Sequence, residues 1–140
     1  MPIGAFISSW ELMNLLTFKP KLGHITTFGG HPINCAASLA TLEHLLASDV
    51  MQKVDEKEQL FRLHLKHPKI KEIRGNGLML AIEFDDEELA KKVVEQSLEN
   101  GLILFYFLFT KTAIRITPPL TITDKEIIEG CKIVKGILEA

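Results

Sequence analysis

The sequence has few cysteines and no metal-binding pattern. Its only two, Cys35 and Cys131, lie far apart, and neither has a second cysteine or a pair of histidines at metal-ligand spacing. We therefore expect no metal site. Both cysteines are interpreted as small buried hydrophobic residues.

Long apolar runs and an excess of charge of one sign are also absent. The longest apolar run, residues 101–109, is too short for a bilayer, which takes about 20 residues, and no positively charged leader opens the chain. The net charge of -2 and the spread of charges along the chain exclude a strong electrostatic surface for nucleic acid. We expect a cytoplasmic protein without a membrane or nucleic-acid partner.

The 140 residues suit one domain, or a small domain plus part of another. Residues 2–9 predict a strand or an extended entry, residues 10–16 a brief helix, and residues 17–23 a loop. A second helix is expected from Pro32, which suits a first helical position. One strand and two helices cannot bury their apolar faces alone, so residues 1–48 are interpreted as the remnant of a larger α/β domain.

Residues 49–140 predict a small α+β domain. Asp49 and Gln52 resemble a capping pair for a connecting helix that ends by His67, ahead of Pro68. A strand follows over residues 70–84, with a bulge or bend at its two glycines.

The rest of this domain is expected to be helix, strand, strand, helix. The helix covers residues 85–101 with an apolar stripe of Leu89, Val93, Val94 and Leu98, and the two strands lie in residues 102–109 and 113–118. Thr123 and Glu126 form a capping box for the last helix. This order predicts an antiparallel sheet with its helices on one face.

The stretch "GHITTFGGHPIN", residues 23–34, is the first candidate site. It places two threonine hydroxyls and two glycines before the positive end of a helix dipole, an arrangement that can hold a phosphate. The alternative is an ordinary loop in which Thr26 and Thr27 bond their own backbone. No Gly-Lys-Ser/Thr ends the stretch, so it is not a Walker loop.

Arg115 is the second candidate. Strand alternation in "AIRIT" sends Ile114 and Ile116 to one face and Arg115 to the other, where its guanidinium can bind a carboxylate through two hydrogen bonds. The alternative is a solvated arginine on the exposed side of a sheet.

Four blocks, "MPIGAFISS", "GHITTFGGHP", "IRGNGLMLAIEF" and "IRITPPLTITDKEI", resemble in order and spacing the C-terminal part of the class III, pyridoxal-phosphate (PLP)-dependent aminotransferases. That family includes acetylornithine, ornithine and 4-aminobutyrate aminotransferases. The resemblance implies the C-terminal part of a fold-type I PLP-dependent transferase. Residues 1–48 would then belong to the large PLP-binding domain, and residues 49–140 would be the small C-terminal domain.

The resemblance also implies roles for single residues. Thr27 matches the threonine that forms a hydrogen bond with the PLP of the neighbouring subunit in a homodimer. Thr26 lies where relatives have a Ser or Thr near the substrate. Arg115 matches the arginine that binds the substrate's α-carboxylate. His31 departs from the Asn of many members. The catalytic Schiff-base lysine is expected upstream of Met1.

The implied activity of the whole enzyme is transfer of an amino group from an amino acid to 2-oxoglutarate through PLP, and the chain alone is expected to be inactive. Two other classes remain open. One is a self-sufficient small-molecule-binding or regulatory α+β domain without catalysis. The other is an interaction module based on the apolar run at residues 102–109, for which a buried strand is the favoured account.

Overall fold

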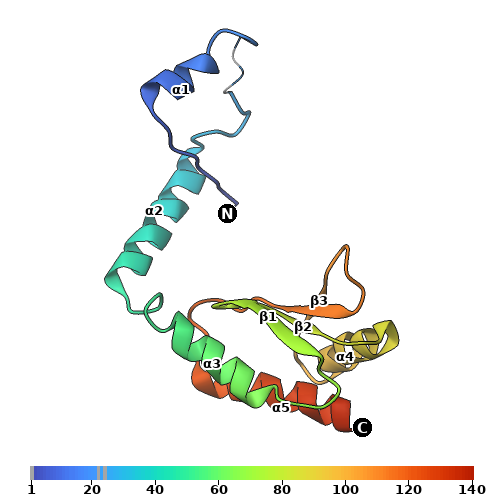
Figure 1. The fold of residues 1–140 in the computed structure, drawn as a ribbon. Coiled ribbons are helices and arrows are strands. Elements are labelled where there is room, and N and C mark those ends of the chain that lie inside the picture. Colours follow the sequence, from blue (N-terminus) through green and yellow to red (C-terminus); the bar gives the residue numbers. More distant parts are fainter. Residues whose placement is uncertain (1, 22, 24) are drawn as a thin grey trace. The chain divides into compact units, whose positions relative to one another are not determined.

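The computed structural model describes residues 2–21, 23 and 25–140. Contacts divide the chain into two compact units, Met1–Ser48 and Asp49–Ala140 (Figure 1). Within the described ranges, no helix combines the length and the apolar character needed to cross a membrane.

In the first unit, residues 2–9 form neither a helix nor a strand, so the predicted strand is not formed there. Helix α1 (Trp10–Leu15) follows, and the Ser9 hydroxyl accepts a hydrogen bond from the Leu12 amide at its start. Helix α2 (Pro32–Ala47) has its proline in the first turn, as predicted. The Asn34 side chain donates to the Pro2 carbonyl at 3.0 Å and so ties the start of the described chain to α2.

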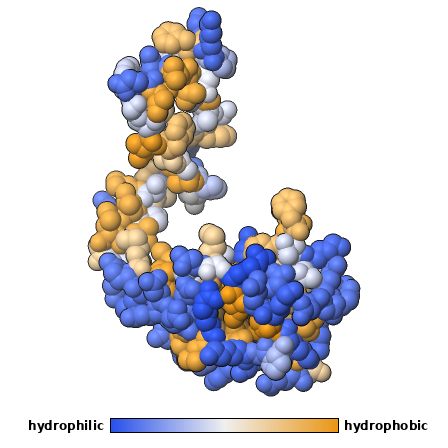
Figure 2. All heavy atoms as spheres, viewed as in Figure 1, coloured by the Kyte–Doolittle hydropathy of each residue, from blue (hydrophilic) through white to orange (hydrophobic). Residues whose placement is uncertain are grey.

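Neither α1 nor α2 buries a residue, although both carry large apolar side chains. Figure 2 shows apolar atoms gathered over this unit. Cys35 is exposed, so the interpretation of it as a buried hydrophobic residue is wrong. A pair of helices with so much exposed apolar surface does not form a core by itself. The large exposed hydrophobic residues of α1 and α2 are Trp10, Leu12, Leu15, Ile33, Leu39, Leu42 and Leu46.

The second unit contains an antiparallel sheet in the order β1-β2-β4-β3. Its strands are β1 (Glu72–Asn76), β2 (Met79–Glu83), β3 (Phe105–Tyr106) and β4 (Ala113–Ile116).

The predicted single strand over residues 70–84 is wrong, because β1 and β2 form a hairpin with a two-residue turn. Gly77 opens that turn with φ of 58°. Gly75 has φ of 118°, and a Cβ there would overlap the Met79 carbonyl oxygen. Both glycines therefore serve the reversal of the chain rather than a bulge.

Three helices pack against this sheet. Helix α3 (Val54–His64) ends before Pro68, as predicted, but it does not begin with the proposed capping pair. Lys53 stands at the cap position, and its ammonium binds the Asp49 carboxylate at 2.7 Å. A competing ion pair thus replaces the predicted cap.

Helix α4 (Glu87–Glu99) is capped by the Asp86 carboxylate and followed by Gly101 with φ of 80°, the predicted left-handed end. Val93 is fully buried, but Leu98 is 63% exposed and does not belong to the apolar stripe. Helix α5 (Asp124–Glu139) begins with the predicted capping box of Thr123 and Glu126.

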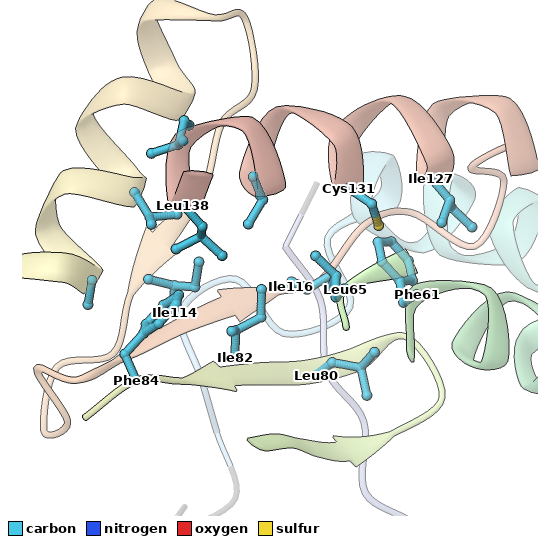
Figure 3. Close-up of a cluster of buried hydrophobic side chains, with 14 of the residues drawn as sticks. Phe61, Leu65, Leu80, Ile82, Phe84, Ile114, Ile116, Ile127, Cys131 and Leu138 are labelled. Atoms are coloured by element: carbon cyan, nitrogen blue, oxygen red, sulfur yellow. The ribbon is translucent and has the colours of Figure 1, made fainter. Parts of the chain in front are cut away.

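The core lies between one face of the sheet and the helices (Figure 3). Side chains of β2 and β4 point toward α5, and those of α3 complete the cluster. The predicted buried strand at residues 102–109 is largely wrong, because only two of these residues form a strand and Leu108 and Phe109 are 93% and 96% exposed. The labelled core residues are Phe61, Leu65, Leu80, Ile82, Phe84, Ile114, Ile116, Ile127, Cys131 and Leu138.

A polar network fastens α3 to the β1–β2 hairpin. The Arg62 guanidinium binds the Glu58 carboxylate at 2.8 Å and donates to the carbonyls of Ile73 and Gly75. The second carboxylate oxygen of Glu58 accepts the Gly77 amide. The hydrogen bond from Arg62 is the main cause that lowers the pKa of Glu58, and the hydrogen bond from Gly77 is the next largest.

The network predicts acid-sensitive stability. Because the pKa of Glu58 is lower in the folded state, its contribution is complete above the unfolded value and is lost as the pH falls through the folded value. We expect Glu58→Gln to lower the free energy of unfolding by about 2 kcal/mol at pH 7, the scale of hydrogen bonds to a charged group. Denaturant titrations followed by circular dichroism should show this difference shrink below about pH 4.

Asp49→Asn provides the matched control. Asp49 and Lys53 have the same four-residue spacing, but both side chains are more than half exposed, and exposed ion pairs contribute little to stability. This variant should unfold like the unchanged chain at pH 7. Equal stabilities of the Glu58→Gln chain and the unchanged chain at pH 7 would show that the network does not hold the hairpin.

Candidate functional site

The turn before α2 is built around Thr26 and Gly29. The Gly29 amide donates to the Thr26 carbonyl at 3.3 Å, and the His31 amide donates to the Phe28 carbonyl at 3.2 Å. A Cβ on Gly29 would lie 2.5 Å from Oγ1 of Thr26, so glycine is required for this close approach. Gly30 has φ of 71°, which also favours glycine.

This turn leaves polar groups available. Within the described part of the chain, no hydrogen bond joins the hydroxyl of Thr26 or Thr27 to another residue, so the self-bonded threonines of the ordinary-loop alternative are not seen. Among the residues that the structure describes, no side chain caps α2, whose first amides have no partner within the helix. Nδ1 of His31 is buried without a hydrogen-bond partner among the described residues. Amides and hydroxyls grouped in this way can hold an anion.

Arg115 lies on β4, the third strand in the order of the sheet. Its neighbours Ile114 and Ile116 are buried against the helices, whereas Arg115 is exposed, so the predicted alternation is confirmed. Because successive side chains of a strand leave opposite faces, Arg115 leaves the sheet face opposite to the one on which Ile114 and Ile116 join the core.

Arg115 differs from the other two arginines of the chain in its electrostatic surroundings. Arg62 binds Glu58, and Arg74, on the same sheet face as Arg115, binds Glu83 at 2.8 Å. The hydrogen bond from Arg74 is the main cause that lowers the pKa of Glu83, and the hydrogen bond from Thr112 is the next largest. Both keep Glu83 ionised. Among the described residues, no carboxylate lies within ion-pair distance of Arg115. Its guanidinium is free to bind an external anion.

Two hollows border Arg115. A shallow one of about 310 Å³ lies on the exposed sheet face and includes Met79, Ala81, Phe107 and Thr117 in its lining. A narrower one of about 140 Å³ lies among the apolar side chains of α3 and α5.

Cys131 lines the narrower hollow, where burial raises its pKa to about 12. Its thiol therefore stays protonated and is not a nucleophile. Its burial confirms the interpretation of Cys131 as a small buried hydrophobic residue.

The two candidate features belong to different units. Thr26 and Thr27 lie in the first unit and Arg115 in the second. Sequence reasoning missed Phe105, whose ring lies 5.5 Å from the Arg115 guanidinium carbon. Across residues 2–21, 23 and 25–140, no three His, Cys, Asp or Glu side chains form a group that could hold a metal ion.

Comparisons with known proteins give the family. A sequence profile of the family "Aminotransferase class-III" matches residues 1–138. Acetylornithine aminotransferase of Caldanaerobacter subterraneus subsp. tengcongensis is 37% identical over 142 residues, which cover 98% of this chain and 34% of that protein. The chain thus spans about a third of the length of this relative.

Solved structures of aminotransferases also resemble this chain. Ornithine aminotransferase of Toxoplasma gondii, described with partial occupancy of PLP at its active site, superposes with a TM-score of 0.74 at 33% identity and covers 92% of this chain and 31% of its own. Adenosylmethionine-8-amino-7-oxononanoate aminotransferase of Methanocaldococcus jannaschii gives a TM-score of 0.73 at 29% identity over 89% of this chain and 31% of its own.

The chain belongs to the class III aminotransferases, a family of PLP-dependent enzymes with the fold-type I architecture. The resemblance predicted from the four sequence blocks is confirmed, together with the fold class.

Proposed function

We propose that this chain supplies the substrate-carboxylate arginine and a cofactor-phosphate turn to a PLP-dependent aminotransferase. The whole enzyme would move an amino group from an amino acid such as ornithine, acetylornithine or 4-aminobutyrate to 2-oxoglutarate. The observation that carries the proposal is Arg115, an exposed guanidinium without a carboxylate partner among the described residues, in a chain matched to the family over residues 1–138. Amino acids and 2-oxo acids both present a carboxylate to such a group.

The turn before α2 fits a phosphate group. Gly29 allows close contact with Thr26, and the first amides of α2 and the hydroxyls of Thr26 and Thr27 provide donors. When bound, PLP supplies the electron sink that makes removal of a proton from the amino acid possible. The role of the turn would be to bind and orient the phosphate. Arg115 would hold the carboxylate and so orient the C–H bond of the amino acid that loses its proton.

A homodimer is part of the proposal, with Thr27 serving the PLP of the neighbouring subunit. The first unit supports this assembly, because α1 and α2 expose large apolar side chains that need a cover. Residues 1–48 would be part of the large PLP-binding domain, and residues 49–140 the small C-terminal domain.

The 140-residue chain by itself should not catalyse transamination. None of its lysines, including Lys19 and Lys21, follows the glycine-rich context that the family's PLP-binding lysine requires. We expect no turnover when the purified chain is incubated with amino donor, 2-oxo acid and PLP and 2-oxo acid consumption is followed by chromatography. Turnover above that of free PLP would contradict this prediction.

Thr27→Ala should weaken PLP binding in the complete enzyme about tenfold, the scale of one hydrogen bond to a charged group. The dissociation constant can be measured from the absorbance of bound PLP. Thr41→Ala is the matched control, because the Thr41 hydroxyl already donates to the Ala37 carbonyl inside α2 at 2.8 Å. Equal PLP affinity of the Thr27→Ala and the unchanged enzymes would exclude the role of Thr27.

A hybrid dimer tests which subunit Thr27 serves. One subunit carries Thr27→Ala and the other Arg115→Ala. If Thr27 serves the neighbour's site and Arg115 its own, one of the two sites retains both residues and about half of the activity remains at limiting PLP. If Thr27 serves its own subunit, both sites are damaged and activity falls to that of the single variants.

Arg115→Ala should lower kcat/KM for the amino donor about a hundredfold, mainly through KM, because the carboxylate loses a two-bond partner. The kcat/KM of Arg115→Lys should lie between those of Arg115→Ala and the unchanged enzyme, since lysine keeps the positive charge but not the planar guanidinium. Arg74→Ala is the matched control on the same sheet face, because Arg74 is already held by Glu83. Unchanged kcat/KM in steady-state assays of Arg115→Ala would refute the assignment.

A further inference from the structure

Phe105 is the aromatic residue directly beside Arg115. The two residues are register partners in the β3–β4 pair, so their side chains leave the same face of the sheet. The Phe105 ring centroid lies 5.5 Å from the guanidinium carbon, within the range of a cation–π contact. Phe105 is 54% exposed and does not belong to the buried core.

The residue that follows Phe105 fixes the strand. Tyr106 leaves the opposite face, and its hydroxyl donates to the Lys91 carbonyl of α4 at 3.4 Å. Burial is the main cause that raises the pKa of Tyr106, so its hydroxyl stays protonated and can donate. This contact holds β3 from the side of the helices and leaves the Phe105 ring on the exposed face.

A second feature separates Phe105 from its aromatic neighbours. Phe109, in the same segment, is 96% exposed and makes no cation–π contact with a described residue. Phe107 lines the shallow hollow that Arg115 also lines, but no cation–π contact joins it to a described residue. The contact with the guanidinium is therefore specific to Phe105 within this apolar run.

We propose that Phe105 is a positioning residue for Arg115, a role that rests on the proposed function of Arg115 in binding the substrate carboxylate. A ring against the guanidinium restricts the rotation of a long side chain and keeps water from part of the cation. A carboxylate binds a guanidinium through its N–H edges, so the ring can hold the group without occupying its binding sites. Phe105 thereby reduces the entropy lost when substrate binds.

The test uses the complete aminotransferase. Phe105→Leu keeps an apolar side chain but removes the π-system, and we expect it to raise KM for the amino donor about threefold with kcat unchanged. The inhibition constant of propionate, an unreactive carboxylate, should rise by the same factor. Phe105→Tyr keeps the ring and should behave like the unchanged enzyme in both measurements.

Controls separate positioning from folding. Phe109→Leu makes the same change in the same segment without a guanidinium partner and should leave KM and the inhibition constant unchanged. If Phe105→Leu lowers the yield of folded enzyme, Phe105→Met replaces it as a flexible apolar variant, with folding checked by circular dichroism.

The outcomes distinguish the two proposals. If Arg115→Ala weakens carboxylate binding but Phe105→Leu and Phe105→Met do not, Phe105 has no positioning role and the proposed function stands. If Phe105→Tyr raises KM as much as Phe105→Leu, the effect is structural and the inference is overturned. If Arg115→Ala has no effect on KM or on propionate inhibition, the proposed function itself fails.

Discussion

Burial of one face of the β2–β4 pair against α5 is the constraint on which the second unit depends. Ile82 and Ile114 are register partners and both are fully buried, so these two strands cannot shift by one residue without exposing their core side chains. The same alternation forces Arg115 to the opposite face. Packing of the core and exposure of the candidate substrate-binding group are therefore two results of one strand register.

Local signals in the sequence were sufficient where a few adjacent residues determine the structure. The capping box at Thr123, the first-turn Pro32 and the left-handed Gly101 each rest on backbone geometry within one turn, and all were predicted. Alternation around Arg115 was equally predictable, because two β-branched residues flank it. The start of α3 was not, since Asp49 can either cap a helix or pair with Lys53, and the ion pair is formed.

Contacts that depend on strand pairing could not be predicted in the same way. Gly75 and Gly77 fit either a bulge or a hairpin, and the difference depends on whether β1 and β2 pair with each other across the turn. Phe105 lay in an apolar run in which every residue looked equally suited to a core. Its contact with Arg115 depends on the register of β3 against β4, which no local pattern determines.

Charge compensation explains why a single arginine of this unit is suited to an external carboxylate. Glu58 and Glu83 each bind one guanidinium, and each accepts a further hydrogen bond, from Gly77 and Thr112 respectively. Carboxylates engaged in this way have lowered pKa values and remain charged at neutral pH, so a substrate carboxylate would have to compete with them for these two arginines. Arg115 instead contacts a ring, which carries no net charge and leaves its positive charge uncompensated. A group that is held in place and still lacks a counter-ion can bind a carboxylate without first breaking an ion pair.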